Sequence, residues 1–150
     1  MTMPADAAEA RAQGWRTLAA LHDRIDGRLA KALAAEHGVS VSEYTVLDVL
    51  SRQEEHHMRM QQLSAAAVLS QSATTRLVTR LEDRGLLSRY LCPTDRRGIY
   101  TEVTPAGQEL LAAARPTHDR VLREALDEAR EVPELAPLVD ALAALPAPAG

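Results

Sequence analysis

The sequence predicts a mainly α-helical protein with one small β-hairpin. Apolar residues recur at three- and four-residue steps near both ends of the chain, as on the buried face of an amphipathic helix. Between these ends, residues 87–91 and 99–103 alternate apolar and polar side chains on either side of a turn-forming stretch. This period of two is typical of a half-buried antiparallel hairpin.

The first expected element is a long helix over residues 5–35. Its apolar stripe consists of Leu18, Leu21, Ile25, Leu29 and Leu33. Gly38 ends it, because glycine readily adopts the left-handed conformation that closes a helix. Ser40 and Glu43 have the spacing of a capping box, so a second helix begins here. That helix carries the apolar set Tyr44, Val46, Leu47 and Leu50, and residues 58–60 then suit a very short strand.

Two further helical segments follow, residues 61–68 and a second segment that ends at Gly85, with a break near Ser70. One face of the second segment carries Ala73, Leu77 and Leu81. The opposite face carries the polar set Ser72, Thr75, Arg76, Thr79 and Arg80. A short helix, a tight turn and a helix with a polar, arginine-bearing outer face predict a helix-turn-helix. Because the hairpin follows at once, we expect a winged helix-turn-helix.

Thr104 and Pro105 mark the start of the next helix, with a capping hydroxyl followed by proline at the first helical position. Pro116 predicts a kink or a break within it. The terminal helices carry more apolar surface than one small domain can cover, and a second copy would bury it. This surface includes Leu18, Leu21, Ile25, Leu138, Leu142 and Leu145. The expected organisation is residues 1–38 for dimerisation, 39–104 for the winged helix-turn-helix, and 105–150 for dimerisation.

The charge distribution points to a polyanionic partner for the middle of the chain. Residues 59–100 hold seven arginines and three acidic residues, a net charge of +4. The other residues carry a net charge of −8, which gives the whole chain its net charge of −4. A basic segment between acidic ends is typical of nucleic-acid binding on a soluble scaffold. A solvated charged face explains the charge alone equally well.

Several function classes lack support in the composition and motifs. We expect neither a membrane span nor a signal peptide, and a single cysteine fits a reducing cytoplasm. P-loop, dinucleotide, HExxH and GxSxG motifs are absent, so we expect no enzyme and no cofactor. Three tyrosines, one tryptophan and no phenylalanine also disfavour a single-strand binder that stacks bases.

The stretch "LSQSATTRLVTRLEDRGLLSRYLCPTDRRGIYTEVTPAG", residues 69–107, resembles the signature of the MarR family of transcriptional regulators. The helix end "LEDRGL", the wing "DRR" and the helix start "TPAG" occur in the family's order and spacing. The resemblance implies a homodimeric, cytoplasmic DNA-binding regulator, with a repressor released by a small aromatic or phenolic effector as the main hypothesis. The alternative is a dimeric ligand- or partner-binding protein of the same fold that no longer binds DNA.

The expected DNA contacts come from two elements. Side chains near the start of a recognition helix reach base edges in the major groove of double-stranded DNA. The candidates there are Ser70, Gln71, Ser72, Thr75 and Arg76, with Arg80 placed for phosphate. In the wing, the resemblance implies that Arg97 enters the minor groove, while Asp95 restrains it and Arg96 meets phosphate. A two-fold dimer would then bind an inverted repeat.

Three further hypotheses concern sensing. Cys92 is either a redox switch or a partly buried structural thiol. The five histidines show no zinc-site spacing, so we expect no metal. Trp15, His22 and Tyr44 are candidates for an effector pocket, because such a pocket needs aromatic walls and a few polar groups. Helix packing is an equally good explanation of these three residues.

Overall fold

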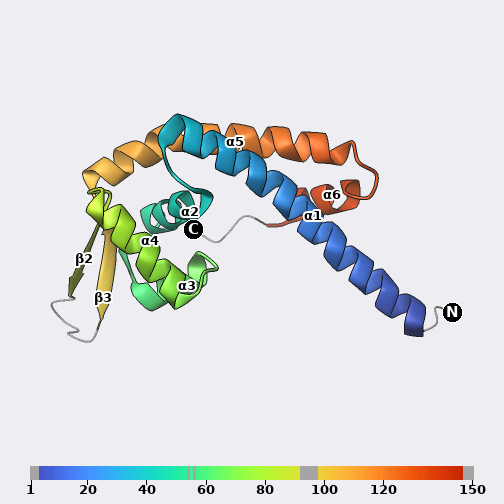
Figure 1. The fold of residues 1–150 in the computed structure, drawn as a ribbon, viewed down its shortest axis with the longest axis horizontal. Coiled ribbons are helices and arrows are strands. Elements are labelled where there is room, and N and C mark those ends of the chain that lie inside the picture. The colour runs from blue at the N-terminus through green and yellow to red at the C-terminus, as the bar shows by residue number, and fades with distance from the viewer. Residues whose placement is uncertain (1–3, 54, 56, 92–97, 147–150) are drawn as a thin grey trace. The chain divides into compact units, whose positions relative to one another are not determined.

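The computed structural model describes residues 4–53, 55, 57–91 and 98–146 of the chain (Figure 1). In order, the elements are α1 Pro4–His37, α2 Val41–Ser51, β1 His57–Arg59, α3 Met60–Ala66, α4 Gln71–Asp83, β2 Leu87–Leu91, β3 Ile99–Val103, α5 Pro105–Arg130 and α6 Ala136–Ala144. The strands form one antiparallel sheet in the order β1-β3-β2. The predicted mainly α fold with a small β-hairpin is therefore confirmed.

The chain divides into two compact units. One contains Met1–Lys31 and His118–Gly150, and the other contains Ala32–Thr117. The second unit, which we call the winged unit, holds α2, α3, α4 and the sheet. The first unit, which we call the terminal unit, holds most of α1, the second half of α5 and α6.

Local signals set the start of the winged unit. Gly38 has φ +67° and ends α1, as expected. Ser40 then caps α2: its Oγ accepts a hydrogen bond from the amide of Glu43 at 3.0 Å, and the Glu43 carboxylate accepts one from the amide of Ser40 at 2.9 Å. The capping box predicted from the sequence is confirmed. It fixes where α2 begins and leaves its apolar face toward the core.

The core of the winged unit is apolar and draws on every helix of that unit. It includes Leu33, Tyr44, Val46, Leu47, Leu50, Leu63, Leu77, Val78, Leu81, Leu87, Val103, Leu111 and Ala114. The four α2 residues expected on the apolar face are all buried. Thus α3 and α4 pack on α2 and on the base of the sheet, and this packing fixes the position of α4 within the winged unit.

In the hairpin, buried and exposed side chains alternate only near its base. Leu87, Thr101 and Val103 are buried, whereas Leu91 and Ile99, which pair with each other at the far end, are 64% and 48% exposed. The two strands extend beyond the helices that cover their base, so alternation no longer corresponds to burial there. The short strand β1 occupies residues 57–59, one residue earlier than predicted.

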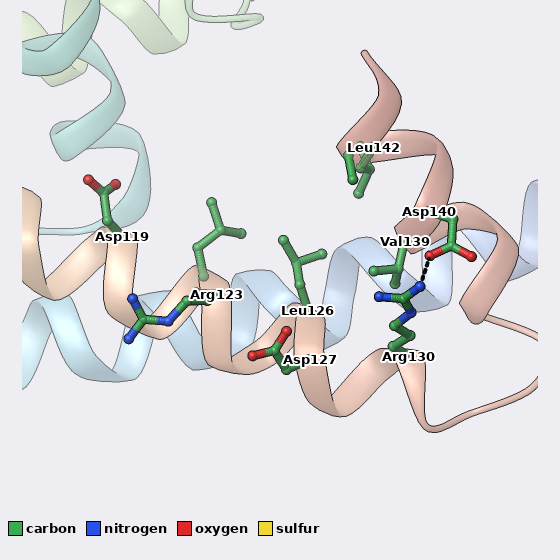
Figure 2. A pocket seen from close by; sticks show the side chains of 10 residues that line it. Asp119, Arg123, Leu126, Asp127, Arg130, Val139, Asp140 and Leu142 are labelled. Atoms are coloured by element: carbon green, nitrogen blue, oxygen red, sulfur yellow. Dashed lines mark ion pairs between the residues drawn. The ribbon is translucent and has the colours of Figure 1, made fainter.

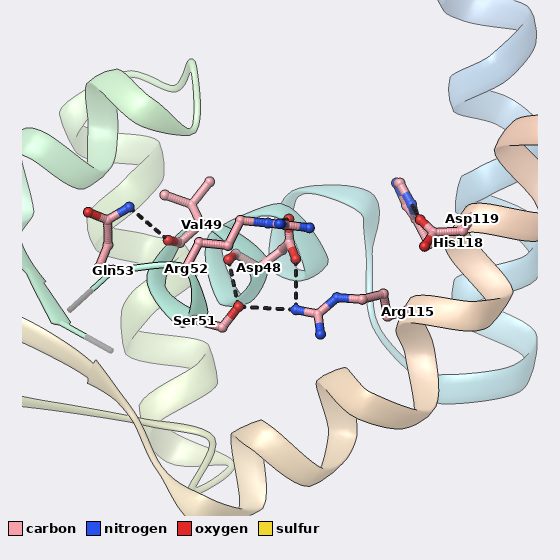
Figure 3. A network of polar contacts seen from close by, with 8 residues as sticks. All are labelled: Asp48, Val49, Ser51, Arg52, Gln53, Arg115, His118 and Asp119. Carbon is pink, nitrogen blue, oxygen red and sulfur yellow. Dashed lines mark hydrogen bonds and ion pairs between the residues drawn. The ribbon is translucent and has the colours of Figure 1, made fainter. Parts of the chain in front are cut away.

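α5 begins as predicted and continues through Pro116 as one helix, so of the kink or break expected there, the break does not occur. The hydroxyl of Thr104 accepts a hydrogen bond from the amide of Gly107 at 3.1 Å, and Pro105 is the first helical residue. Next to the proline, Arg115 donates hydrogen bonds to Asp48 at 3.0 Å and to Ser51 at 3.1 Å on α2 (Figure 3). Side-chain contacts thus hold this part of α5 in place despite the proline.

In the terminal unit, α1, α5 and α6 pack around Leu21, Ala129, Leu135 and Val139, with Ile25 and Leu138 against them. Arg28 on α1 forms an ion pair with Glu128 on α5. Other large apolar side chains of this unit remain exposed: Trp15, Leu18, Leu142 and Leu145. Part of the apolar surface assigned to dimerisation is therefore used within the chain, and part is free. In the described part of the chain, no helix is both long enough and apolar enough to cross a membrane.

Candidate nucleic-acid interface

The helix α4 presents a polar face to solvent. Ser70 caps it, since its hydroxyl accepts a hydrogen bond from the amide of Ala73 at 3.1 Å. Its buried face is Thr74, Leu77, Val78 and Leu81. Compared with the predicted stripe, Thr74 and Val78 were missed, and Ala73 is only half-buried. The exposed face carries the candidate contact residues Ser70, Gln71, Ser72, Thr75, Arg76 and Arg80.

These exposed side chains differ in how free they are to bind a partner. Thr75 donates its hydroxyl to the carbonyl of Gln71 at 2.9 Å, so its polar group is already used within the helix. Arg76 and Arg80, by contrast, make no ion pair or hydrogen bond with another side chain in the described ranges. Both line a groove of about 260 Å³ that also includes Ser40 and Ser42 at the start of α2. Two unpaired guanidinium groups beside hydroxyl donors suit an anionic ligand such as a phosphate backbone.

The turn between α3 and α4 holds a residue that the sequence did not flag. Val68 has φ +57°, a left-handed conformation that branched side chains rarely adopt, and its side chain is 89% exposed. The turn is closed by hydrogen bonds from the amides of Val68 to Ala65 and of Leu69 to Ser64. This tight turn sets the angle between the two helices.

The end of α4 is tied to its surroundings by two arginines. Glu82 accepts hydrogen bonds from Arg89 on β2, one from the guanidinium at 2.8 Å and one from the backbone amide at 3.1 Å. The hydrogen bond from the Arg89 side chain holds the pKa of Glu82 below its ordinary value, although partial burial opposes this. Arg84 donates to the carbonyl of Gly38 at 3.1 Å and lies 3.6 Å from Glu43. These contacts fix α4 relative to the hairpin and to the start of α2.

The sheet carries an aromatic cluster beside the wing. Tyr90 and Tyr100 stack with their centroids 5.8 Å apart, and His57 packs edge-on against Tyr100 at 4.9 Å. The hydroxyl of Tyr90 lies 2.8 Å from Nδ1 of His57. The cluster joins all three strands. The predicted wing contacts Asp95, Arg96 and Arg97, and also Cys92, lie outside the described residues.

The three effector-pocket candidates occupy different environments. Tyr44 is buried in the core of the winged unit, at 4% exposure. Trp15 and His22 belong to the terminal unit and are both exposed, with Trp15 at 71%. Among the residues that the structure describes, no three histidine, cysteine or carboxylate side chains are grouped as they would be to hold a metal ion.

Comparisons with known proteins match the part of the chain that contains α2, α3, α4 and the start of the hairpin. A sequence profile of the MarR family matches residues 37–98. HTH-type transcriptional regulator MhqR of Bacillus subtilis is 32% identical over 83 residues, which cover 55% of this chain and 56% of MhqR. The chain spans about half the length of the curated relatives it matches.

Two solved structures extend the comparison beyond this region. AbsC, a MarR family transcriptional regulator from Streptomyces coelicolor, is 27% identical with a TM-score of 0.74, over 95% of this chain and 92% of AbsC. A MarR family transcriptional regulator from Rhodococcus sp. RHA1 is 31% identical with a TM-score of 0.64, over 69% of this chain and 71% of that protein. With this identity and coverage, and with a winged helix-turn-helix in the structure, the chain belongs to the MarR family of transcriptional regulators.

Proposed function

We propose that this protein is a homodimeric regulator of transcription that binds double-stranded DNA through α4 and the wing. The observation that supports this most directly is the pair of exposed arginines on α4, Arg76 and Arg80, which have no side-chain partner among the described residues. An arginine in the major groove can bind a guanine edge with two hydrogen bonds, and an arginine beside the groove can bind phosphate. The net charge of +4 over residues 59–100 draws the same region toward DNA.

In this proposal Arg76 reads bases and Arg80 contacts the backbone. Arg76 lies nearer the start of α4, where recognition helices contact bases, and Arg80 lies one turn further along. A dimer would place two such helices on an inverted repeat whose half-site centres are about 34 Å apart. Arg97 would insert into the minor groove at the flanks, with Asp95 restraining it and Arg96 on phosphate.

The decisive experiment measures the affinity of the dimer for DNA selected from a random duplex pool. Arg76→Ala should weaken binding by about 5- to 150-fold for each half-site and relax the preference at one base pair of each half-site, because a bidentate contact is worth roughly 1–3 kcal/mol. Arg97→Ala should weaken binding chiefly to DNA sites whose flanking sequences are rich in A·T base pairs. Arg24→Ala is the control, since Arg24 is an exposed arginine on α1 of the terminal unit. Its loss should leave affinity unchanged.

The same experiment separates the two function classes. If the selection enriches no sequence while the protein is a folded dimer, the protein is a ligand- or partner-binding member of the fold that does not bind DNA. If Arg76→Ala and Arg24→Ala lower affinity equally, binding depends on charge alone and α4 does not read sequence.

We also infer that a small aromatic or phenolic effector releases the DNA, which would make the protein a repressor. This inference depends on the family resemblance and not on a cavity formed by Trp15, His22 and Tyr44. Titration of small aromatic acids and phenols into the protein–DNA complex tests it. A compound that lowers DNA affinity while raising the melting temperature of the free protein would support it, and a panel with no such compound would count against it.

A further inference from the structure

The edge strand β2 is bonded to the end of α4 by one carboxylate. The sheet order β1-β3-β2 leaves β2 with a neighbouring strand on one side only. One oxygen of Glu82 accepts a hydrogen bond from the Arg89 guanidinium at 2.8 Å, and the other accepts one from the Arg89 backbone amide at 3.1 Å. Backbone amides at a sheet edge lack a partner strand, so a carboxylate that binds one of them takes the place of that strand. Glu82 thus holds the main chain of the hairpin as well as a side chain.

An ion pair of the same length in the terminal unit shows what is particular about this contact. Arg130 on α5 and Asp140 on α6 lie 2.8 Å apart, and their side chains are 63% and 55% exposed (Figure 2). Side chains as exposed as these can exchange their partner for water at little cost. Glu82 and Arg89 are only about one-third exposed, and their contact includes a backbone amide. Breaking it therefore changes how the strand is held and not only how two side chains are solvated.

The chain connection between α4 and β2 does not by itself fix the direction of the hairpin. It passes through Gly85, which has φ +76° and is a residue type with wide conformational freedom. The Thr104 hydroxyl donates to the carbonyl of Gly85 at 2.6 Å, which anchors the turn at the hairpin base. Arg89 is the third residue of β2, further along the strand, and beyond it Leu91 is exposed. A bond at Arg89 therefore limits bending of the hairpin about its base more than a bond at the turn does.

We propose that Glu82 is a positioning residue for DNA binding, which sets the angle between α4 and the wing through its two bonds to Arg89. This inference rests on the proposed function, in which α4 lies in the major groove and the wing reaches the adjoining minor groove. Because the two grooves lie side by side on one duplex, a narrow range of angles lets both elements bind together. Glu82 is negatively charged and phosphate repels it, so its contribution to binding comes through Arg89 and not through a contact with DNA.

The affinity of the dimer for two versions of the selected operator tests this role at neutral pH. One version has A·T-rich flanks, whose narrow minor groove the wing reads, and the other has G·C-rich flanks. Glu82→Gln places an amide NH₂ against one of the two Arg89 donors. It should weaken binding to the A·T-rich version by about 2- to 30-fold and leave binding to the G·C-rich version nearly unchanged. In an Arg97→Ala background, Glu82→Gln should not reduce the preference further.

Asp83→Asn is the matched control, because it makes the same change of charge one residue along the chain. The Asp83 side chain is exposed and forms no ion pair or hydrogen bond with another side chain in the part of the chain that the structure describes. Removing its negative charge should leave the preference for A·T-rich flanks intact and make binding equal to or slightly tighter than that of wild type. Circular dichroism establishes that both variants are folded at the assay temperature.

Charge and stability predict different results from positioning. If Glu82 acted only through its charge, Glu82→Gln would bind as Asp83→Asn does. If it acted only through stability, Glu82→Gln would weaken binding to both operator versions by the same factor. Either result overturns the inference, and so does a wild-type dimer that shows no preference for A·T-rich flanks. A random pool from which the wild-type protein enriches no sequence would overturn the proposed function itself.

Discussion

Glu82 accepts two hydrogen bonds from a single residue, Arg89, and so joins the end of α4 to the first strand of the hairpin. Neither residue is remarkable in the sequence, because charged residues near a helix end are usually solvated. Their pairing depends on the turn at Gly85, which has φ +76° and folds β2 back along the helix end. The contact therefore becomes visible only once the fold is known.

Acid should weaken this contact within a defined pH range. The pKa of Glu82 is held below its ordinary value of 4.5 by the side-chain hydrogen bond from Arg89. The carboxylate thus stabilises the fold above that value, and the contribution is lost as the pH falls through the lowered pKa. Because both side chains are about one-third exposed, we expect less than about 1 kcal/mol. Urea unfolding should show Glu82→Gln less stable than wild type at neutral pH, with a smaller gap at an acid pH below the lowered pKa of Glu82. An equal gap at both pH values would show that the charge is not responsible.

Gly107 is a second residue whose role is set by its neighbours. A Cβ at this position would overlap the carbonyl oxygen of Leu86 and lie 2.7 Å from Cγ1 of Val103. Gly107→Ala should therefore push the first turn of α5 away from the hairpin base and cost about 1–3 kcal/mol, seen as a lower melting temperature. Gly27→Ala is the control, because a Cβ there meets nothing within 4 Å on α1. It should gain roughly 0.5–1 kcal/mol instead.

The tight turn between α3 and α4 requires a left-handed backbone conformation at a position that holds a β-branched residue, Val68. Val68 adopts φ +57° with an exposed side chain, so its packing does not compensate for the backbone conformation. Glycine at this position would relieve the steric conflict, since left-handed conformations cost L-residues about 1–2 kcal/mol. We expect Val68→Gly to raise stability by about 1 kcal/mol in denaturant unfolding, after the entropy of glycine is subtracted. Val68→Ala retains a Cβ and should gain little, and a destabilised Val68→Gly would show that the entropy cost of glycine exceeds the relief of backbone strain.

Most of the elements were predictable because their signals are local. The capping box at Ser40 and Glu43, the glycine after α1 and the Thr104-Pro105 start of α5 each act within one turn of the chain. The exposure of Arg76 and Arg80 followed from helical periodicity in the same way. Features that depend on distant neighbours were missed or misjudged. Val78 is buried because α3 and the sheet cover that side of α4, and Leu91 is exposed because nothing packs there within the described residues.

The whole molecule is acidic, yet its proposed ligand is a polyanion. A net charge of −4 repels DNA, so binding must come from the local positive charge of residues 59–100. Each guanidinium that meets a phosphate releases condensed counterions. Affinity for an operator duplex should therefore fall on the order of 10³-fold between about 50 and 200 mM salt if the dimer neutralises about six phosphates.

The salt dependence also separates the two α4 arginines. Arg80→Ala should reduce the slope of log affinity against log salt by about two, one for each copy in the dimer, with little change in sequence preference. Fluorescence anisotropy over a salt series measures this slope. A slope unchanged in Arg80→Ala would mean that Arg80 does not contact phosphate.

The proline within α5 has a consequence for the timescales on which this helix opens. Pro116 has no amide hydrogen, so the carbonyl one turn earlier, at Ala112, lacks its usual helical donor. Side-chain contacts hold this turn instead: Arg115 donates a hydrogen bond to Asp48 on α2, and the Thr117 hydroxyl lies 2.8 Å from Nε2 of His37. Backbone amides around this turn should exchange with deuterium faster than those in the middle of α4, through a local opening that leaves the rest of the fold intact. Removing the Arg115 or Thr117 side chain should accelerate exchange at this turn first, because there the helix is held by its neighbours more than by its own hydrogen bonds.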